Sequence, residues 1–378
     1  MNLEPTETEA QLRAEVRAWL RENLPWEYGK GLPPHFDDLA AEVAFGRDWQ
    51  AKLAEGRWVG VAWPEEYGGR GAGAVEHFIV TEELARARAP ELVGRIGVNL
   101  VGPTLLARGA PAQKERWLPN ILSARELWCQ LFSEPGAGSD LAGLATRAAR
   151  RGDIYVVTGQ KVWSSHAQFA DWGIALVRTD PSSHRSKGLS MLAIPMTASG
   201  VDARPLRQMT GESEFNEVFL DGVEVPIENV IGPENEGWRV ANNILANERG
   251  GGYIWRQQVR QEEAVDRLWK QCAGAGLLDD PLVRQRVAQA WIDVQIFRLH
   301  NQRTLARLAV GEEIGAESSL VKLFWSEASK RLYETGYDLL ADDEWANDFL
   351  YSRANTIMGG TSQIQRNIIG ERILGLPR

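Results

Sequence analysis

The hydrophobic pattern of this 378-residue chain changes from helical to strand-like and then back to helical. Up to about Ser123, apolar residues recur at the spacing of amphipathic helices. From Glu126, short β-branched or aromatic runs alternate with glycine- and aspartate-containing turn signals, and the helical period returns near Asn235. The sequence therefore predicts a multidomain α+β protein with an α-helical part at 1–124, a β domain at 125–234 and a helical part at 235–378.

Local signals place several element boundaries. Thr8 followed by Gln11 resembles a capping box at the start of the first helix. A second helix should begin near Asp37 or Asp38, and Pro281 should open a long helix. The predicted strands are LWCQLF, IYVVTG, GIALVRT and LSMLAIP. EFNEVFLDGVEVP alternates, and its end, Val223–Pro226, is predicted to be a last strand.

Composition and charge exclude several classes of function. The net charge of −9 argues against a nucleic-acid or anionic-membrane binder. Cys129 and Cys272 are too few for a disulfide framework, and the spacing of cysteines and histidines resembles no zinc site, so we expect no metal. The N-terminus is unlike a signal peptide and no apolar run approaches membrane-spanning length. We therefore expect a cytoplasmic protein.

SEPGAGSD, Ser133–Asp140, is the first candidate ligand-binding stretch, because it follows the predicted strand LWCQLF. Polar side chains and glycines in a turn after a strand can wrap backbone amides around a phosphate or the edge of a heterocycle. The alternative is a surface turn without a ligand.

KVWSS, Lys161–Ser165, is the second candidate. Trp163 offers a flat aromatic face, and Ser164 and Ser165 add hydroxyl groups, which together suit a flat cofactor. The alternative is a core tryptophan, since the chain contains 15 tryptophans.

A predicted helix over Ala241–Trp255 contains Glu248 and Arg249 directly before the glycines Gly250–Gly252. Each glycine inside a helix costs about 1 kcal/mol relative to alanine, so a need for space is indicated there. A carboxylate beside such a gap can act as a general base with a raised pKa. The alternative is an exposed, ion-paired glutamate.

The segment Ile357–Pro377 begins with two glycines, followed by Thr361, which is an N-cap type residue, and Gln363. A glycine turn that runs into a helix N-terminus suits close approach of a polar or anionic ligand. The alternative is an ordinary helix start.

Together these stretches resemble the acyl-CoA dehydrogenases, and the resemblance runs nearly from end to end. SEPGAGSD resembles a family signature, KVWSS its flavin-stacking strand, and GTSQIQRNIIGERILGLP the end of its last helix. QMTGESEFNEVFLDGVEVPIENVIG is similar to the segment that closes its β domain. The resemblance implies a helical N-domain, a central β-barrel and a C-terminal four-helix bundle, with FAD between domains and subunits.

The resemblance also implies roles for individual residues. Trp163 would stack near the isoalloxazine, and Ser165 would hydrogen-bond flavin N5. The remaining FAD contacts would come from Leu131, Ser133, Gly138, Ser139, Thr361 and Gln363. The acyl-CoA substrate would be contacted by Ser139, Arg249, Gly359 and Gly360. Electrons would pass to an electron-transfer flavoprotein or a similar acceptor.

One departure from the family concerns the catalytic base, which removes the α-proton while the β-hydride goes to flavin N5. Many relatives have a glutamate immediately before the Gly-Thr of the last signature, where this chain has Gly359. Isovaleryl- and long-chain-type relatives instead place the glutamate before an arginine on the first helix of the C-domain. Glu248-Arg249 fits that second pattern, so Glu248 is the predicted base, and the amide of Gly359 would bond the thioester oxygen.

A second departure concerns assembly. The family's Arg-x-x-Phe-Gly and Gln-x-x-Gly-Gly stretches, which reach the neighbouring subunit's FAD, are missing. Either Arg284 or Arg286 substitutes in a homo-oligomer (a dimer or tetramer), or a related partner chain supplies the contacts in a heterotetramer. The glycines and the displaced base hint at a branched or bulky acyl group. The alternatives are a flavin oxidase or desulfinase on the same fold, or a partner subunit of a heteromeric enzyme.

Overall fold

The computed structural model describes residues 6–31, 36, 38–248 and 252–377, with the backbone alone at positions 247 and 248. The chain divides into two compact units. We call them the sheet unit, Pro33–Ala72 with Pro90–Glu248, and the bundle unit, Met1–Leu32 with Gly73–Ala89 and Arg249–Arg378.

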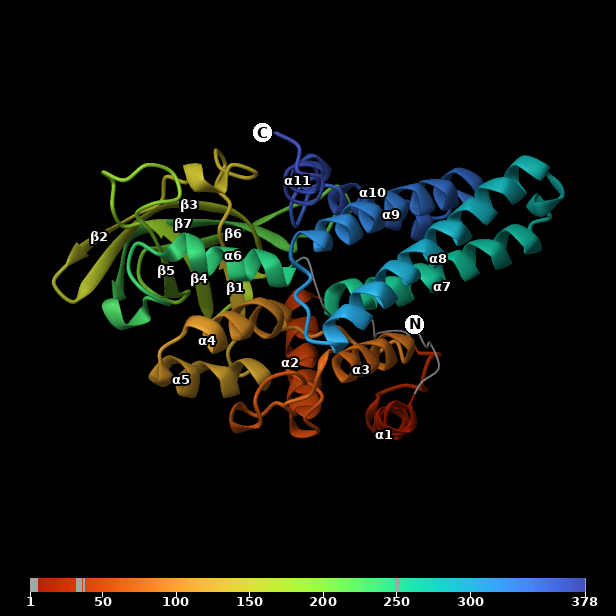
Figure 1. Cartoon of the computed structure of the whole chain (residues 1–378), viewed down its shortest axis with the longest axis horizontal. Helices are drawn as coiled ribbons and strands as arrows, with labels where there is room; N and C mark the ends of the chain where they lie inside the picture. The colour runs from red at the N-terminus through yellow and green to blue at the C-terminus, as the bar shows by residue number, and fades with distance from the viewer. Residues whose placement is uncertain (1–5, 32–35, 37, 249–251, 378) are drawn as a thin grey trace. The chain divides into compact units, whose positions relative to one another are not determined.

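The sheet unit is built on a seven-stranded curled sheet with the order β1-β4-β2-β3-β7-β6, in which β5 also pairs with β4 (Figure 1). The strands are β1 Trp128–Leu131, β2 Arg147–Arg151, β3 Ile154–Ser165, β4 Trp172–Arg178, β5 Leu189–Pro195, β6 Val201–Leu206 and β7 Phe215–Pro226. β1 runs parallel to β4, whereas β3 and β7 form a long antiparallel pair. The helices of this unit are α2 Leu39–Glu55, α4 Gly102–Arg108, α5 Pro111–Leu122 and α6 Gly237–Glu248.

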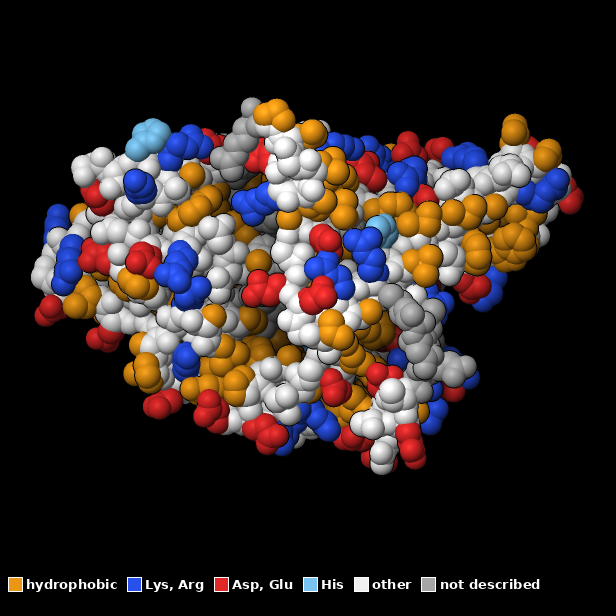
Figure 2. Space-filling model, in the orientation of Figure 1, with side chains coloured by type: hydrophobic (Ala, Val, Ile, Leu, Met, Phe, Trp, Pro, Cys, Tyr) orange, Lys and Arg blue, Asp and Glu red, His pale blue; other side chains and the backbone are white. Residues whose placement is uncertain are grey.

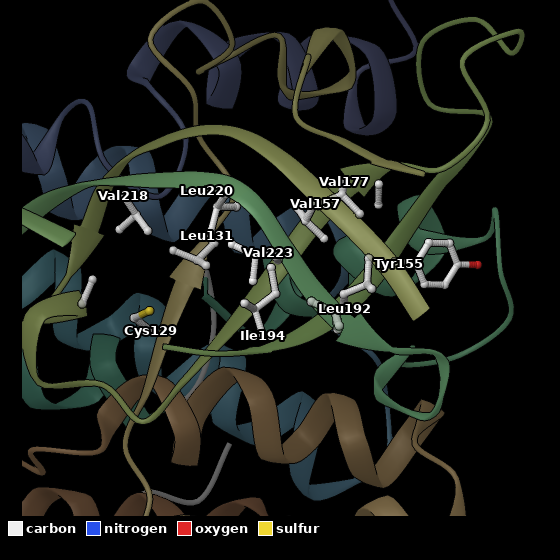
Figure 3. Close-up of a cluster of buried hydrophobic side chains, with 14 residues drawn as sticks. Cys129, Leu131, Tyr155, Val157, Val177, Leu192, Ile194, Val218, Leu220 and Val223 are labelled. Carbon is white, nitrogen blue, oxygen red and sulfur yellow. The ribbon is translucent and has the colours of Figure 1, made fainter. Parts of the chain in front are cut away.

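The sheet encloses a core of small and branched apolar side chains (Figure 3). Alternate residues of β3 and β7 point inward, because successive side chains of a strand face opposite sides of the sheet. Tyr155 and Val157 of β3 and Val218, Leu220 and Val223 of β7 are all buried in this core. The apolar side chains that made these runs recognisable as strands are thus the ones that hold the sheet together.

The end of the sheet differs from the prediction. Val223–Pro226 is not a separate strand but continues β7. Asp221 and Gly222 form a bulge opposite Thr158, because the β3–β7 register shifts there and Gly222 adopts a φ of 65°. An Asp-Gly pair therefore bends one strand here instead of making a hairpin turn.

Two strands, β2 and β6, had no counterpart in the predicted set. Their sequences, RAARR and VDARPL, are largely exposed and carry charges, so they lack the apolar runs used to recognise strands.

The bundle unit contains the long helices α7 Gly252–Gly274, α8 Pro281–Ala309 and α9 Ser318–Leu340, which pack side by side (Figure 1). α10 Asp343–Asn355 packs on α9 and buries Trp345 in their shared core. The other helices of the unit are α1 Glu7–Asn23, α3 Ala74–Arg86 and α11 Ser362–Ile368.

A buried carboxylate joins α1 to α3. Glu83 of α3 is fully buried and accepts hydrogen bonds from Arg13 at 2.5 Å and from Arg17 at 2.6 Å, both on α1. The Tyr28 hydroxyl donates to the same carboxylate at 2.6 Å. Burial alone would raise the pKa of Glu83, but these hydrogen bonds outweigh it and lower the pKa below its ordinary value.

The helix starts were predicted with mixed success. The first helix is capped by Thr6 and Glu9, which form a complete capping box, so the predicted pair Thr8 and Gln11 is wrong. Both pairs have the same spacing, and the local sequence could not separate them. The predicted N-cap Asp38 and the opening Pro281 are confirmed.

The predicted helix Ala241–Trp255 corresponds to two elements, since α6 ends at Glu248 and α7 begins at Gly252, with 249–251 outside the described residues. The predicted fold class, helical parts on either side of a curled β-sheet in sequence, is confirmed. Over the described ranges, no helix combines the length and apolarity needed to cross a bilayer.

Candidate functional site

The loop after β1 forms a tight turn at the start of SEPGAGSD. Glu134 and Ala137 exchange backbone hydrogen bonds of 3.1 and 3.0 Å, with Pro135 and Gly136 at the corner. A Cβ at Gly136 or Gly138 would meet no described atom within 4 Å, and neither glycine has a left-handed φ. The fold itself therefore gives no reason for glycine at these positions, which leave room for a ligand to approach the backbone.

The turn is fastened to β3. The amide of Val162 donates to the carbonyl of Ser133 at 2.9 Å. Lys161, which is completely buried, donates from Nζ to Oε1 of Glu134 at 2.9 Å. The hydrogen bonds thus bring the turn carrying Ser133, Gly138 and Ser139 next to the strand that carries Trp163 and Ser165.

Trp163 has an unusual backbone and an exposed side chain. Its φ of 62° lies in the left-handed region, which costs a non-glycine residue about 1–2 kcal/mol. It sits where the β3–β7 register shifts between Lys161 and Ser164, and its indole is 62% exposed. A tryptophan held in a strained conformation with its ring outward contributes little to the core. The structure thus argues against the core alternative, and strain of this kind is found where a site needs it.

The next residues complete this edge of β3. Ser164 is buried, and its hydroxyl has no hydrogen-bond partner among the described residues. Its carbonyl accepts from Nδ2 of Asn216 at 3.0 Å. Ser165 is half-buried and pairs with Phe215 of β7. His166 again has a positive φ, 53°, so the backbone is irregular on both sides of the serine pair.

Two ion pairs within the sheet unit lie beside this edge. Arg95 forms ion pairs with Glu91 and Glu214. Burial, and then the positive charge of Arg95, lower the pKa of His166. The lowered pKa favours the neutral imidazole of His166.

In the bundle unit, Gly359 and Gly360 form the turn before α11, with φ values of 64° and 92°. Thr361 is the N-cap, and its hydroxyl accepts from the amide of Ile364 at 3.2 Å, as the sequence predicted. Gln363 is exposed. Gln365 stabilises the turn, since its Nε2 donates to the carbonyls of Gly359 and Gly360 at 3.2 and 3.0 Å.

Several other predicted residues lie away from these two surfaces or outside the description. Leu131 points into the sheet core (Figure 3), so only its backbone is left for a ligand. Glu248 ends α6, but its side chain and all of Arg249 lie outside the described residues. Arg284 donates to the carbonyl of Leu278, and Arg286 pairs with Asp338. Both arginines are thus engaged within their own unit.

Sequence interpretation missed three residues that build the site: Lys161, Glu134 and Gln365. For Lys161 a signal existed, since it shares the inward-facing parity of Tyr155 and Val157 on β3. A lysine at an inward position must find acceptors inside the protein. The partners of Glu134 and Gln365 depend on loop conformation, which no spacing rule describes.

The chemistry of the sheet-unit surface fits a flavin nucleotide. An exposed indole offers a face for a flat heterocycle, Ser165 offers a hydroxyl, and the open glycine turn offers backbone amides to phosphate. The residues that the structure describes contain no group of three or more His, Cys, Asp or Glu side chains arranged to hold a metal ion.

Three family models match almost the whole chain. They are the N-terminal domain of acyl-CoA dehydrogenase over residues 6–125, the middle domain over 129–223 and the C-terminal domain over 235–374. Acyl-CoA dehydrogenase IpdE1 of Mycobacterium tuberculosis is 42% identical over 381 aligned positions, covering 97% of this chain and 98% of that protein.

Solved structures agree with this assignment. The Tcur3481-Tcur3483 steroid ACAD superimposes with a TM-score of 0.86 at 29% identity, covering 100% of both chains. The ChsE4-ChsE5 complex of Mycobacterium tuberculosis gives a TM-score of 0.84 at 30% identity, again over 100% of both chains. From this match across all three parts, the chain belongs to the acyl-CoA dehydrogenases, an enzyme family of flavoproteins.

Proposed function

We propose that this protein is an FAD-dependent dehydrogenase that introduces an α,β double bond into an acyl-CoA thioester. The observation that carries the proposal is Trp163, which is strained at φ 62° and 62% exposed beside an open glycine turn. Family membership alone does not require a competent flavin site. An indole that is kept exposed at the cost of backbone strain supports a competent flavin site.

The chain's own residues would hold the cofactor from two surfaces. On the sheet unit, Trp163 would lie against the isoalloxazine, Ser165 would donate to N5, and the turn amides with Ser133 and Ser139 would hold the edge of the ring and the pyrophosphate. On the bundle unit, Thr361 and Gln363 are the proposed FAD contacts. FAD, when bound, supplies the acceptor for the β-hydrogen as hydride, and its electrons would pass to an electron-transfer flavoprotein or similar acceptor.

Glu248 would remove the α-proton, and the amide of Gly359 would donate to the thioester oxygen. The φ of 64° at Gly359 supports this assignment of the two roles, because a glutamate is strained in that conformation. A backbone amide needs no side chain to stabilise the negative charge that develops on the oxygen. Arg249, Gly360 and Ser139 are the other proposed substrate contacts.

The acyl group is proposed to be bulky. One relative that matches over its full length is named a steroid ACAD. The sequence of this chain agrees, because the glycines at 250–252, which begin two positions after the proposed base, reduce side-chain volume. The proposed domains are 1–124, 125–234 and 235–378.

The direct test is anaerobic reduction of the purified protein by a panel of acyl-CoA thioesters that runs from short straight chains to steroid side-chain thioesters. Bleaching of a bound flavin by wild type but not by Glu248→Gln supports both the reaction and the base. The matched control is Glu236→Gln, an exposed carboxylate paired with Arg239 at the start of the same helix, which should bleach normally.

Each contrary result of this test identifies a different error. Equal bleaching by Glu248→Gln contradicts the base assignment alone. A bound flavin that no thioester reduces contradicts the dehydrogenase proposal. Oxygen consumption or sulfite release with the same protein would identify the oxidase or desulfinase alternative.

For assembly, we propose that a related but different acyl-CoA dehydrogenase subunit covers one face of the bundle unit. α7 and α8 expose apolar side chains along this face, where Figure 2 shows hydrophobic groups gathered, and a groove of about 540 Å³ lies between the helices. Trp269 and Trp291 line the groove and are 53% and 56% exposed. Two large exposed aromatic groups on adjacent helices are typical of an interface.

The choice of a different subunit rests on two observations. Two matching structures are named for two proteins each, Tcur3481 with Tcur3483 and ChsE4 with ChsE5. The candidate substitutes for the missing inter-subunit flavin contacts, Arg284 and Arg286, are engaged within the bundle unit. Purification as a homo-oligomer with one FAD per chain would contradict this part of the proposal.

A further inference from the structure

The buried ammonium of Lys161 touches three separate segments of the sheet unit. Its side chain has no exposed surface, and Nζ donates to the carbonyl of Phe132 at 3.1 Å, to the carbonyl of Leu176 at 2.8 Å and to Glu134 at 2.9 Å. All three donor positions of the ammonium are therefore used. The acceptors come from the end of β1, from β4 and from the SEPGAGSD turn.

The carboxylate of Glu134 extends this network to β2. It accepts from the amides of Ala145 and Thr146, at 2.6 and 2.9 Å, just before β2 begins. Burial would raise the pKa of Glu134, but the positive charge of Lys161 and the donated hydrogen bonds lower it, which keeps the group ionised. One ion pair thus joins β1, β2, β3 and β4 around the turn.

The partners of this pair bracket one residue of the candidate site. Phe132 and Glu134 stand on either side of Ser133, and the carbonyl of Ser133 itself accepts from Val162, the residue after Lys161. Three consecutive positions of the loop are therefore fixed to two consecutive positions of β3. The position after these two is Trp163.

Stability alone does not explain a buried charge pair. Removing two charges from water costs several kcal/mol per ion, and packed apolar groups of similar volume often stabilise a fold as well or better. Apolar groups, however, cannot form hydrogen bonds with buried backbone carbonyls and amides. Without the pair, the carbonyls of Phe132 and Leu176 and the amides of Ala145 and Thr146 would each lose a hydrogen-bond partner in the interior.

The network also fixes the backbone next to Trp163. A residue in the left-handed region relaxes unless its surroundings hold it there. Lys161 and Val162 anchor the chain directly before Trp163, and Asn216 anchors it directly after through the carbonyl of Ser164. We propose that Lys161 and Glu134 are positioning residues, which hold the turn of Ser133–Ser139 and the indole of Trp163 in the relative positions that one ligand requires. This inference rests on the proposed function, because the ligand is the proposed FAD.

The test compares Lys161→Met with wild type in two measurements. The first is hydrogen exchange of the peptide spanning 132–146 in the flavin-free protein. The second is the dissociation constant for FAD, followed by flavin fluorescence. Lys161→Met should speed exchange in this peptide and at the amide of Val162, which donates to Ser133, while β5 and β6 are unchanged. It should also weaken FAD binding at least about tenfold, since misplacement near 1 Å has effects of that size or larger.

The matched control is Arg204→Met, which also replaces a cation with methionine in the same sheet. Arg204 pairs with Asp202, but both side chains are exposed, so neither measurement should change. If Lys161→Met does not fold, the double variant Lys161→Met with Glu134→Gln replaces it, because it leaves no unpaired buried charge. Glu134→Gln alone tests the second partner and should give the same two changes.

The outcomes separate this inference from the proposed function. Wild type that binds no FAD contradicts the proposed function, and exchange in the 132–146 peptide then decides alone whether the pair sets the turn. Unchanged exchange in Lys161→Met overturns the positioning role. Faster exchange with unchanged FAD affinity also overturns it, because the turn would then be held for some purpose other than the cofactor.

Discussion

Trp163 and Phe215 meet edge to face across the β3–β7 pair, with ring centroids 6.1 Å apart and an interplanar angle of 83°. The contact steadies one edge of the indole and leaves its ring largely exposed. An aromatic contact of this kind contributes about 0.5–1.5 kcal/mol, which is comparable to the strain at Trp163.

Substituting Trp163 should therefore separate stability from binding. Trp163→Gly should be about 1 kcal/mol more stable than Trp163→Ala, because only glycine relieves the left-handed strain at φ 62°. Both variants should bind FAD about tenfold more weakly than wild type, because both lose the aromatic face. Urea unfolding of the flavin-free proteins and FAD titration give the two numbers. A more stable alanine variant would contradict the strain, and unchanged binding would contradict the stacking role.

Two glycine-to-alanine changes in the bundle unit should have opposite signs. Gly359→Ala should lower the free energy of unfolding by about 1 kcal/mol, because φ is 64° at this position. Gly274→Ala should raise it by about 0.4–1 kcal/mol, because Gly274, the last residue of α7, is exposed and a Cβ there would meet no described atom within 4 Å, so alanine mainly restricts the unfolded chain. Thermal unfolding of both variants and of wild type measures the two changes in unfolding free energy. Stabilisation by Gly359→Ala would mean that the turn before α11 is not left-handed in solution.

The buried Glu83 should make stability depend on pH. Because its pKa is lower in the folded protein than the ordinary value of 4.5, its contribution is complete above that pH and is lost as pH falls through the folded pKa. Glu83→Gln should destabilise the protein by about 3 kcal/mol at pH 7, because it leaves Arg13 and Arg17 without their shared anion.

The difference in unfolding free energy between wild type and Glu83→Gln should shrink as pH is lowered below 4.5. Urea titrations at neutral and acidic pH measure it. Glu27→Gln is the control, since its pair with Lys30 is about 70% exposed on both sides and should contribute less than about 1 kcal/mol at any pH. A gap that stays constant with pH would show that Glu83 is not the titrating group.

The apolar face of α7 and α8 should respond to a single charge. Trp291→Glu should weaken association with the proposed partner subunit by at least about 2 kcal/mol, since aromatic side chains at the centre of an interface contribute on that scale. Met209→Glu, at another exposed apolar position, is the control, because Met209 is 66% exposed in the sheet unit. Molecular mass by light scattering of the co-purified subunits reports the change. An assembly that resists Trp291→Glu must use another surface.

Sequence patterns predicted best where one interaction dominates. The runs around Val157, Val218 and Val223 became core strands because burial of branched side chains decided their structure. The N-caps Asp38 and Thr361 were correct because a side-chain oxygen can satisfy a helix amide within three residues. The pattern missed β2 and β6, whose stability comes from strand neighbours and not from their own apolar content.

Features of the candidate site that depend on distant partners could not be predicted. Lys161 and Glu134 are 27 positions apart, and nothing local joins them. The strain at Trp163 arises from a register shift, which depends on how β7 pairs with β3. The motifs thus supplied the stretches proposed as the candidate site, whereas the contacts that hold these stretches in shape emerged only from the fold.

The division of the chain into two units also affects the order in which a nascent chain can fold. Every residue of the sheet unit has been synthesised by Glu248, whereas the bundle unit needs the last 130 residues as well as its two early segments. α1 and α3 therefore leave the ribosome long before α7 and α8, which pack on α3, exist. Domains generally fold as units during synthesis, and exposed apolar surface in the meantime favours aggregation. The ion pairs of Arg13 and Arg17 with Glu83 would hold α1 and α3 together until the other helices of the bundle unit have been synthesised.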